Sequence, residues 1–455
     1  MWNTKTCIVR KLRVSESSAT GQPSKSAAKP RKFQAIKGVR DLLPSETPLW
    51  NHVEETARAV FGTFGFDEIR LPIFEPTELF ARSIGLDTDV VSKEMYTFAD
   101  RDESMISLRP EATASVCRAY IEHGMQLLPA AAKLYYLGPM FRRERPQKGR
   151  YRQFYQIGAE VLGGNDAPGI DAEVIEMVMV FFDRLDLQRV ELNINSIGCR
   201  DCRPKYVEVL RRELLKVKDQ LGADSQRRIE TNPLRVLDSK LESEQKIIAT
   251  LPQMAAHLCA ACAEHFAEVK RQLELRGVIY RENWRLVRGL DYYMRTTFEI
   301  TAQGLGAQNA VCGGGRYDGL VELLGGPPTK GIGFAIGEDR LILSLQESGR
   351  APAAQGRDFY IAWMGEKAFA TAIRAAKTLR AAGYRVELPA AEQKFGKALG
   401  QADKLGSRFA LILGDDEVAS GEWTLKTLAD GSQAKYTESD LLEYLDEAKA
   451  STPGT

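Results

Sequence analysis

Apolar side chains recur at steps of three and four residues between positions 50 and 64. This spacing places them on one face of a helix, which Gly65 is expected to end. Residues 66–71 then alternate between apolar and polar side chains, and Pro72 follows, which cannot continue a ladder of backbone hydrogen bonds. The pattern predicts a helix, a turn and a strand.

The next segments carry strand patterns with one helix among them. Strands are predicted at residues 133–137, 151–161 and 190–195, and a helix at roughly residues 171–185. The long stretches between these segments favour antiparallel pairing over a regular alternation of parallel strands and helices. We therefore expect an α+β fold built on an antiparallel sheet.

A charged helical pattern runs from residue 203 to about residue 276. Strand-like alternation resumes at Trp284. We interpret the helical stretch as an insertion at about residues 199–282 of a sheet domain that covers residues 34–345.

Residues 346–357 carry Gly, Pro and Ala without an apolar period, which is typical of a linker. Beyond it, strand and helix patterns alternate and predict a small α/β domain over residues 358–455. The predicted elements are strands at residues 359–363, 384–388 and 409–413, and helices that include Ile373, Leu379 and Lys397.

The composition is that of a soluble globular protein, with 44% hydrophobic and 27% charged residues. At 455 residues the chain is long enough for two or three domains, and no apolar run reaches the length of a membrane span. The formal net charge is only +1, so a polyanion has to be held by local basic patches. The basic residues in the first half of the C-terminal domain are either a solvated face or such a patch.

Residues 1–33 differ from the rest of the chain, because they are basic and rich in serine, and Glu16 is their only acid. Three interpretations stay open: an organellar transit peptide, a disordered extension, or a misassigned start codon. We treat the segment as a disordered basic extension outside the fold. We expect a cytoplasmic protein, with an organellar location as the alternative.

Four of the seven cysteines form two pairs with metal-ligand spacing, Cys199 with Cys202 and Cys259 with Cys262. Two such pairs resemble a four-thiolate zinc site. The gap between the pairs is longer than in a compact zinc ribbon, so only tertiary folding can close such a site. Structural zinc and reduced, partly buried thiols therefore both stay open, and we assign no metal ligand.

The chain has no G-x-x-x-x-G-K-[ST] loop, so a nucleotide site has to be built from other groups. Three segments carry arginine, at residues 141–146, 288–293 and 333–340. Guanidinium is permanently charged and forks onto phosphate oxygens, which suits displacement at an α-phosphate. Alone, each feature has an ordinary interpretation: exposed arginines, tyrosines of a sheet, or, for glycines 313–315, a turn or a close backbone approach.

In this order, the arginine segments resemble the motifs of class II aminoacyl-tRNA synthetases, and specifically of histidyl-tRNA synthetase. The helix and strand that end at Pro72 resemble motif 1 of the class, residues 141–160 resemble motif 2, and residues 333–340 resemble motif 3. The resemblance runs from about Gly38 to the end of the chain. It implies a class II antiparallel-sheet catalytic domain with a helical insertion, an anticodon-binding C-terminal α/β domain and, through motif 1, a homodimer.

Two segments carry the histidine specificity of the resemblance. Residues 288–293 are similar to a signature of the histidine enzyme, and residues 108–113 to its amino-acid-binding loop. The signature argues against a synthetase for another amino acid. The alternative from another class is a histidine-binding paralogue similar to the regulatory subunit of ATP phosphoribosyltransferase. Such paralogues typically lack the C-terminal domain and lose motif arginines, whereas this chain has both.

The resemblance implies a two-step ligase reaction. Histidine and ATP form histidyl-adenylate and pyrophosphate, and histidine then passes to the 3′-terminal adenosine of its tRNA. Arg142 and Arg340 are implied to hold ATP phosphates, and Arg288 to contact the histidine carboxylate and the α-phosphate, so these three are the implied catalytic residues. Mg²⁺ is expected on the pyrophosphate oxygens, held mainly by substrate and water.

The same resemblance implies which side chains bind the substrates. A carboxylate and a phenol together satisfy both nitrogens of an imidazole, and such a site rejects analogues that lack them by about 10⁴ to 10⁵. Tyr155 and Gly313 depart from the family, which often has His and Ala there. The implied ligands are Glu111, Thr113 and Gln156 for the α-amino group, Glu160 and Tyr293 for the imidazole, with Tyr292 beside them, Arg288 for the carboxylate, and Arg142, Glu144, Phe154 and Arg340 for ATP.

Overall fold

The computed structural model describes residues 32–85, 88, 90–290, 292–302, 309–349 and 356–450. Residues 448–450 are described by their backbone alone. The expectation for residues 1–33 therefore lies almost wholly outside the described residues, as does the middle of the predicted linker. No described helix combines the length and the apolar character that crossing a lipid bilayer requires.

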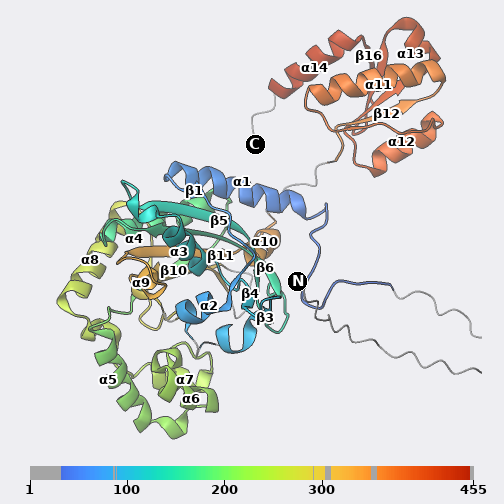
Figure 1. The fold of residues 1–455 in the computed structure, drawn as a ribbon. Helices are drawn as coiled ribbons and strands as arrows, with labels where there is room; N and C mark the ends of the chain where they lie inside the picture. The colour runs from blue at the N-terminus through green and yellow to red at the C-terminus, as the bar shows by residue number, and fades with distance from the viewer. Residues whose placement is uncertain are drawn as a thin grey trace, which may run out of the picture.

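An eight-stranded sheet forms the centre of the larger part of the chain (Figure 1), and the predicted α+β class is confirmed. The six central strands pair antiparallel, whereas the outermost strand on each side pairs parallel. Each outermost strand has only two residues. In order across the sheet the strands are β1 (Asp67–Glu68), β5 (Ala132–Phe141), β6 (Gln153–Leu162), β11 (Gly331–Gly337), β10 (Ala310–Arg316), β9 (Met294–Ala302), β7 (Val190–Ser196) and β8 (Arg281–Glu282).

The predicted first helix, α1 (Thr47–Thr63), packs on one face of this sheet. Its apolar stripe is buried, and the ring of Phe61 meets the rings of Phe181 and Phe334 edge-on at centroid distances of 5.6 and 5.9 Å. Phe181 lies on α4 (Pro168–Arg184), the second predicted helix, and Phe334 lies on β11. Burying one such ring contributes about 1.5–3 kcal/mol, so the periodic pattern itself fixes α1 to the sheet.

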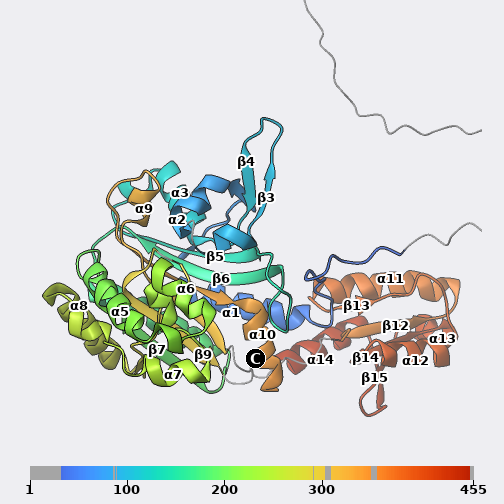
Figure 2. The same cartoon turned by 90° about the horizontal axis from the view of Figure 1, so that it is seen from below.

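A smaller layer covers the opposite face of β5 and β6 (Figure 2). In this layer α3 begins at Thr113, so the predicted amino-acid-binding loop ends at a helix N-terminus. The layer contains a three-stranded sheet of β2 (Phe74–Pro76), β4 (Met105–Leu108) and β3 (Tyr96–Ala99), together with α2 (Thr77–Ile84), α3 (Thr113–Glu122) and α9 (Leu320–Leu323).

A group of helices is inserted between β7 and β9, two strands that are neighbours in the sheet (Figure 1). Its own core includes the buried side chains of Tyr206, Leu210, Ile229 and Ile248. The last of these helices also contributes Phe266, Val269 and Leu273 to the main core. The α-helices are α5 (Arg203–Lys216), α6 (Ala223–Thr231), α7 (Glu242–Ile248) and α8 (Ala260–Leu275).

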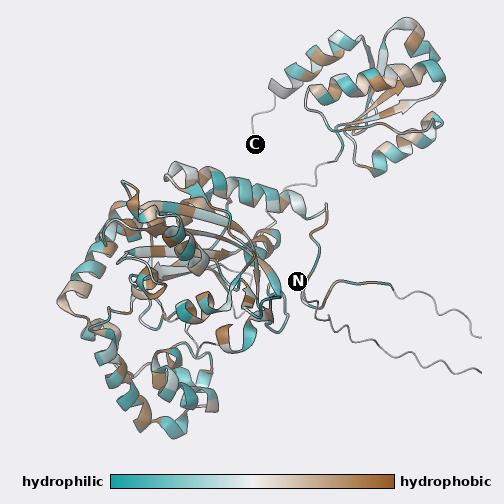
Figure 3. Ribbon diagram, in the orientation of Figure 1, coloured by the Kyte–Doolittle hydropathy of each residue, from teal (hydrophilic) through white to brown (hydrophobic). Residues whose placement is uncertain are grey.

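The C-terminal part of the chain is a five-stranded sheet with helices on both faces. One core packs α11 and α14 against the sheet, and a second core packs α12 against its other face. In Figure 3 the central strands of this sheet are largely brown and the helices alternate brown and teal, in keeping with one buried side for each helix. The strands are β13 (Val386–Glu387), β12 (Phe359–Trp363), β14 (Phe409–Leu413), β15 (Trp423–Thr427) and β16 (Gln433–Tyr436), and the helices are α11 (Glu366–Ala381), α12 (Phe395–Lys404), α13 (Asp415–Ser420) and α14 (Glu438–Ala450).

The strand predicted at residues 66–71 is wrong in length, because only Asp67 and Glu68 pair with β5. Further along, the carbonyls of Leu71 and Pro72 accept hydrogen bonds from the guanidinium of Arg109 at 2.9 and 3.2 Å. A side chain therefore satisfies the backbone groups that a neighbouring strand was expected to satisfy.

The strand predicted to resume at Trp284 is also wrong, because the next strand after β8 begins at Met294. The carbonyls of Trp284 and Leu286 accept hydrogen bonds from the amide of Asn195 at 3.2 and 2.9 Å. This loop leads into the signature segment at residues 288–293. The boundaries predicted for the domains stay predictions.

Candidate active site

A pocket of about 280 Å³ lies over strands β6, β10 and β11. Its wall joins segments that are far apart in the sequence: the loop before α3, motif 2, the signature loop and motif 3. Among the residues predicted to bind substrates, all but Glu160 line this pocket. They are Glu111, Thr113, Arg142, Glu144, Phe154, Gln156, Arg288, Tyr292, Tyr293 and Arg340.

Several guanidinium groups in the pocket wall favour an anionic ligand. The Nε of Arg142 donates to the Pro110 carbonyl at 2.9 Å, and its guanidinium lies 5.3 Å from the ring centroid of Phe154. Arg340 donates to the Ala310 carbonyl at 2.7 Å. Burial and the charge of nearby Arg150 lower the pKa of Arg340 below its usual value. Guanidinium does not give up its proton, so Arg340 stays charged beside Arg150. A bound phosphate would offset the repulsion between the two cations.

Arg288 is held by one acidic neighbour and retains an unused donor. Its Nη1 donates to Glu299 at 2.9 Å, and within the described residues its buried Nε has no hydrogen-bond partner. The guanidinium lies directly over Gly313 of β10, where an added methyl group would overlap Nη2. The departure from the common alanine therefore gives this arginine room, and the glycine run is a close backbone approach within a strand, not a turn.

Glu111 and Gln156 place hydrogen-bond acceptors in the pocket, so they favour a ligand that donates hydrogen bonds. The Glu111 carboxylate accepts from the backbone N–H groups of Thr113 and Ala114, at 2.7 and 3.0 Å, in the first turn of α3. Burial nevertheless raises the pKa of Glu111 above its ordinary value. The amide oxygen Oε1 of Gln156 is buried without a donor among the residues that the structure describes. An ammonium group would supply both needs.

Glu160 lies beneath the pocket and is 1% exposed. Its carboxyl oxygens accept hydrogen bonds from Thr113 Oγ1 and from the Tyr317 hydroxyl, both at 2.6 Å. Burial raises the pKa of Glu160 to about 8, which outweighs the two hydrogen bonds that act to lower it. The carboxyl group is therefore protonated at neutral pH when no ligand is present.

Glu160→Gln is expected to stabilise the protein increasingly as the pH rises. In wild type the unfolded chain ionises Glu160 above about 4.5 while the folded chain stays protonated up to about 8, so the group costs nothing at low pH and its cost grows through this window. Urea unfolding of both proteins at pH 5, 7 and 9 should show a gap that widens by an amount on the order of a few kcal/mol. A gap independent of pH would contradict the protonated state.

Three features of the site were missed from the sequence. Tyr317 donates a hydrogen bond to Glu160, but it stands two residues after the glycine run, whose ordinary interpretation drew no attention to it. Glu299 pairs with Arg288 from the middle of β9, where nothing in the pattern marks it. Arg109 supports the binding loop by donating to the Pro139 carbonyl at 2.9 Å, in addition to its bonds to Leu71 and Pro72. It lies in segment 108–113, whose similarity to an amino-acid-binding loop could have identified it.

Tyr155, the other departure from the family, also lines the pocket. Its ring lies edge-on against Trp50 of α1 at 5.3 Å, and its backbone N–H donates to Asp339 at 2.9 Å. These contacts connect the pocket floor to the first helix and to motif 3.

Known proteins match both parts of the chain. The family described as histidyl-tRNA synthetase matches residues 38–341, and the anticodon binding domain family matches residues 358–448. A histidine–tRNA ligase of Solibacter usitatus is 53% identical over 417 residues, which cover 91% of this chain and 99% of that protein.

Solved structures match as well. The apo histidyl-tRNA synthetase of S. aureus has a TM-score of 0.76 and 36% identity, covering 91% of this chain and 99% of that one. An ATP phosphoribosyltransferase regulatory subunit/histidyl-tRNA synthetase from Bacillus halodurans has a TM-score of 0.62 at 19% identity, covering 85% and 99%, and so shares the fold. The chain belongs to the histidyl-tRNA synthetase family.

Proposed function

We propose that the chain is a histidine–tRNA ligase that uses the described pocket for both of its chemical steps. The observation that carries this proposal is the pairing of opposite demands in one pocket. Arg288 and Arg340 favour an anionic ligand, whereas Glu111 and Gln156 offer acceptors for an ammonium group. An amino acid bound beside a nucleoside triphosphate would supply both the ammonium group and the anions.

In the first step a histidine carboxylate oxygen attacks the α-phosphorus of ATP, and pyrophosphate leaves. Glu111, Thr113 and Gln156 hold the α-amino group, while the unused Nε of Arg288 turns to the carboxylate and the α-phosphate. Negative charge grows on the α-phosphate oxygens in the transition state, and fixed guanidinium groups stabilise it without reorganisation. Arg142 and Arg340 take the departing phosphates, and Phe154 and Glu144 take the adenine.

Histidine selection rests on Glu160 and Tyr293 in this proposal. The Tyr292 and Tyr293 rings lie 4.7 Å apart, and Tyr292 meets Tyr317 at 5.8 Å, so the aromatic groups brace one another. A protonated Glu160 donates one hydrogen bond, and ionised it accepts one. Either state has a complementary imidazole nitrogen. Tyr293 serves the other nitrogen.

Magnesium is proposed to arrive with ATP. The pocket offers Glu144 and Glu299 as carboxylates, and both already face arginines: Glu144 lies 3.2 Å from Arg150, and Glu299 lies 2.9 Å from Arg288. These residues fit a Mg²⁺ ion held mainly by phosphate oxygens and water, with few protein ligands. The ion supplies neutralisation of charge on the pyrophosphate.

The second step requires tRNA, which we propose to contact the basic half of the C-terminal domain and the loop at residues 145–150. A homodimer through α1 and β1 and a cytoplasmic location complete the proposal. The organellar alternative has no support among these relatives.

The test is ATP–pyrophosphate exchange with each amino acid in turn, followed by charging of tRNA. We expect exchange with histidine to exceed exchange with any other amino acid by about 10⁴ or more, because buried polar groups would be left unpaired by an analogue. Light scattering on the same preparation should give the mass of a dimer. Histidine binding without exchange would instead favour a regulatory role, and exchange driven by another amino acid would remove the specificity claim.

A further inference from the structure

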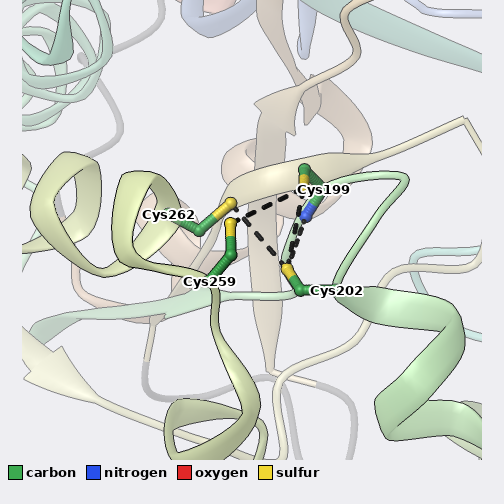
Figure 4. A group of neighbouring side chains, drawn as sticks. All are labelled: Cys199, Cys202, Cys259 and Cys262. Carbon is green, nitrogen blue, oxygen red and sulfur yellow. Dashed lines mark hydrogen bonds between the residues drawn. The ribbon is translucent and has the colours of Figure 1, made fainter.

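Four cysteines lie together outside the pocket, at the base of the helical insertion (Figure 4). Cys199 and Cys202 stand in the turn between β7 and α5, and Cys259 and Cys262 stand at the start of α8. The four sulfur atoms lie within 4.8 Å of one another. The fold therefore closes the long gap between the two pairs that the sequence left open.

The spacing of the sulfurs discriminates between the possible uses of four cysteines. The Sγ distances are 3.7 Å for Cys199 to Cys202, 3.9 Å for Cys199 to Cys259 and 3.9 Å for Cys202 to Cys262. A tetrahedron with Zn–S bonds of about 2.3 Å requires sulfurs about 3.8 Å apart. A disulfide requires about 2.05 Å. A [4Fe–4S] cluster binds each cysteine sulfur to a separate iron and needs a wider cage.

We propose that this chain binds one structural Zn²⁺ ion through the thiolates of Cys199, Cys202, Cys259 and Cys262. The site is suited to stay closed, since Cys202 and Cys262 are 3% and 1% exposed. A closed four-thiolate shell leaves no position for water or substrate, so the ion has a structural and not a catalytic role.

Backbone groups around the cysteines are arranged for thiolates. The N–H of Cys199 points to Cys202 Sγ at 3.3 Å, and the N–H of Asp201 points to Cys199 Sγ at 3.4 Å. Cys202 and Cys259 are the N-cap residues of α5 and α8, where the helix dipoles favour negative charge. These donors offset the net negative charge of a zinc ion with four thiolates, while the Asp201 carboxylate, at 3.9 Å from Cys199 Sγ, lies at the exposed side.

The position of the site allows the ion to cross-link the two ends of the helical insertion. It joins the point where the chain enters the insertion to a helix near the point where the chain leaves it. Arg203, next to Cys202, donates to the Tyr293 carbonyl, and the N–H of Arg295 donates to the Gly198 carbonyl at 2.8 Å. Zinc therefore also fixes the segment that carries Tyr293, a proposed imidazole ligand.

The experiment measures metals in the full-length protein, purified without added metal and without a chelator or an affinity metal. We expect about one zinc per chain by mass spectrometry. A Cys259→Ser, Cys262→Ser double variant should lose it, and Cys117→Ser, which alters a buried cysteine of α3 remote in sequence from both pairs, should retain it.

Cobalt exchange tests the ligand set without a variant. Wild type stripped by chelation under reducing conditions and refilled with Co²⁺ should show the visible bands of tetrahedral cobalt and strong thiolate-to-cobalt charge transfer. Wild type with far less than one zinc per chain and no cobalt spectrum would overturn the proposal, as would stoichiometric iron or zinc retained by the double variant. Metal content is independent of histidine activation, so this proposal and the proposed function can fail separately.

Discussion

Arg288→Ala is expected to lower the rate of histidyl-adenylate formation by about 10²- to 10³-fold or more, the cost of removing one preorganised donor from a developing oxyanion. Arg288 has a buried Nε without a partner in the described residues, and a backbone floor at Gly313 that leaves room for its guanidinium. The measurement is pyrophosphate exchange over a range of histidine and ATP concentrations, where the loss should appear in kcat as well as in KM.

Arg285→Ala is the matched control, because its guanidinium lies over the Trp284 ring at 5.4 Å and is not among the groups that line the pocket. It should keep most of the exchange activity. Arg288→Lys retains the charge but loses the planar fork, so it should restore only part of the rate. If Arg288→Ala exchanged pyrophosphate at the wild-type rate, the role given to this arginine would be wrong.

Gly333→Ala is expected to weaken histidine binding by up to about 10²-fold, the loss of a charged hydrogen bond worth up to about 3 kcal/mol. Gly333 of β11 pairs with Glu160 of β6, and an added methyl group would overlap the Glu160 carboxyl group. The carboxyl group has to leave Thr113 and Tyr317, and the strand pair itself loses about 1–3 kcal/mol through overpacking. Isothermal titration with histidine measures the first effect, and thermal unfolding the second.

Gly337→Ala on the same strand separates a general effect of alanine from the displacement of Glu160. Its added methyl group would meet only the Arg340 side chain, with Cδ nearest at 3.7 Å, an ordinary contact. Histidine affinity should change far less than in Gly333→Ala. Equal losses in the two variants would show that β11 tolerates no alanine and would remove the argument about Glu160.

Hydrophobic periodicity predicted the helices and strands that are stabilised by burying one face. The stripe of α1, the existence of strands β5 and β6 and the first strands of the C-terminal sheet follow from it. It failed where side chains replace backbone partners, as Arg109 does at Leu71 and Asn195 does at Trp284. The hairpin of β15 and β16 went unpredicted, since its short strands carry mixed polar and apolar residues.

The site was predicted by resemblance more than by pattern. No periodicity distinguishes Arg142 or Arg288 from an exposed arginine, and only the order of the motifs along the chain brought them together. The pocket gathers ten of the eleven predicted ligands, but the role of each stays a prediction. Glu299 could not be found this way, because it lies outside every motif and meets Arg288 only when the signature loop folds against β9.

The two-residue strands at the margins of the large sheet affect how the protein behaves when crowded. An unpaired strand edge invites a second molecule to extend the sheet, which is a common start of aggregation. Here the margins consist of Asp67 and Glu68 on one side and Arg281 and Glu282 on the other, all exposed. Neither margin offers a long apolar ladder to a neighbour. The large sheet can thus be kept at high concentration during synthesis without growing edge to edge.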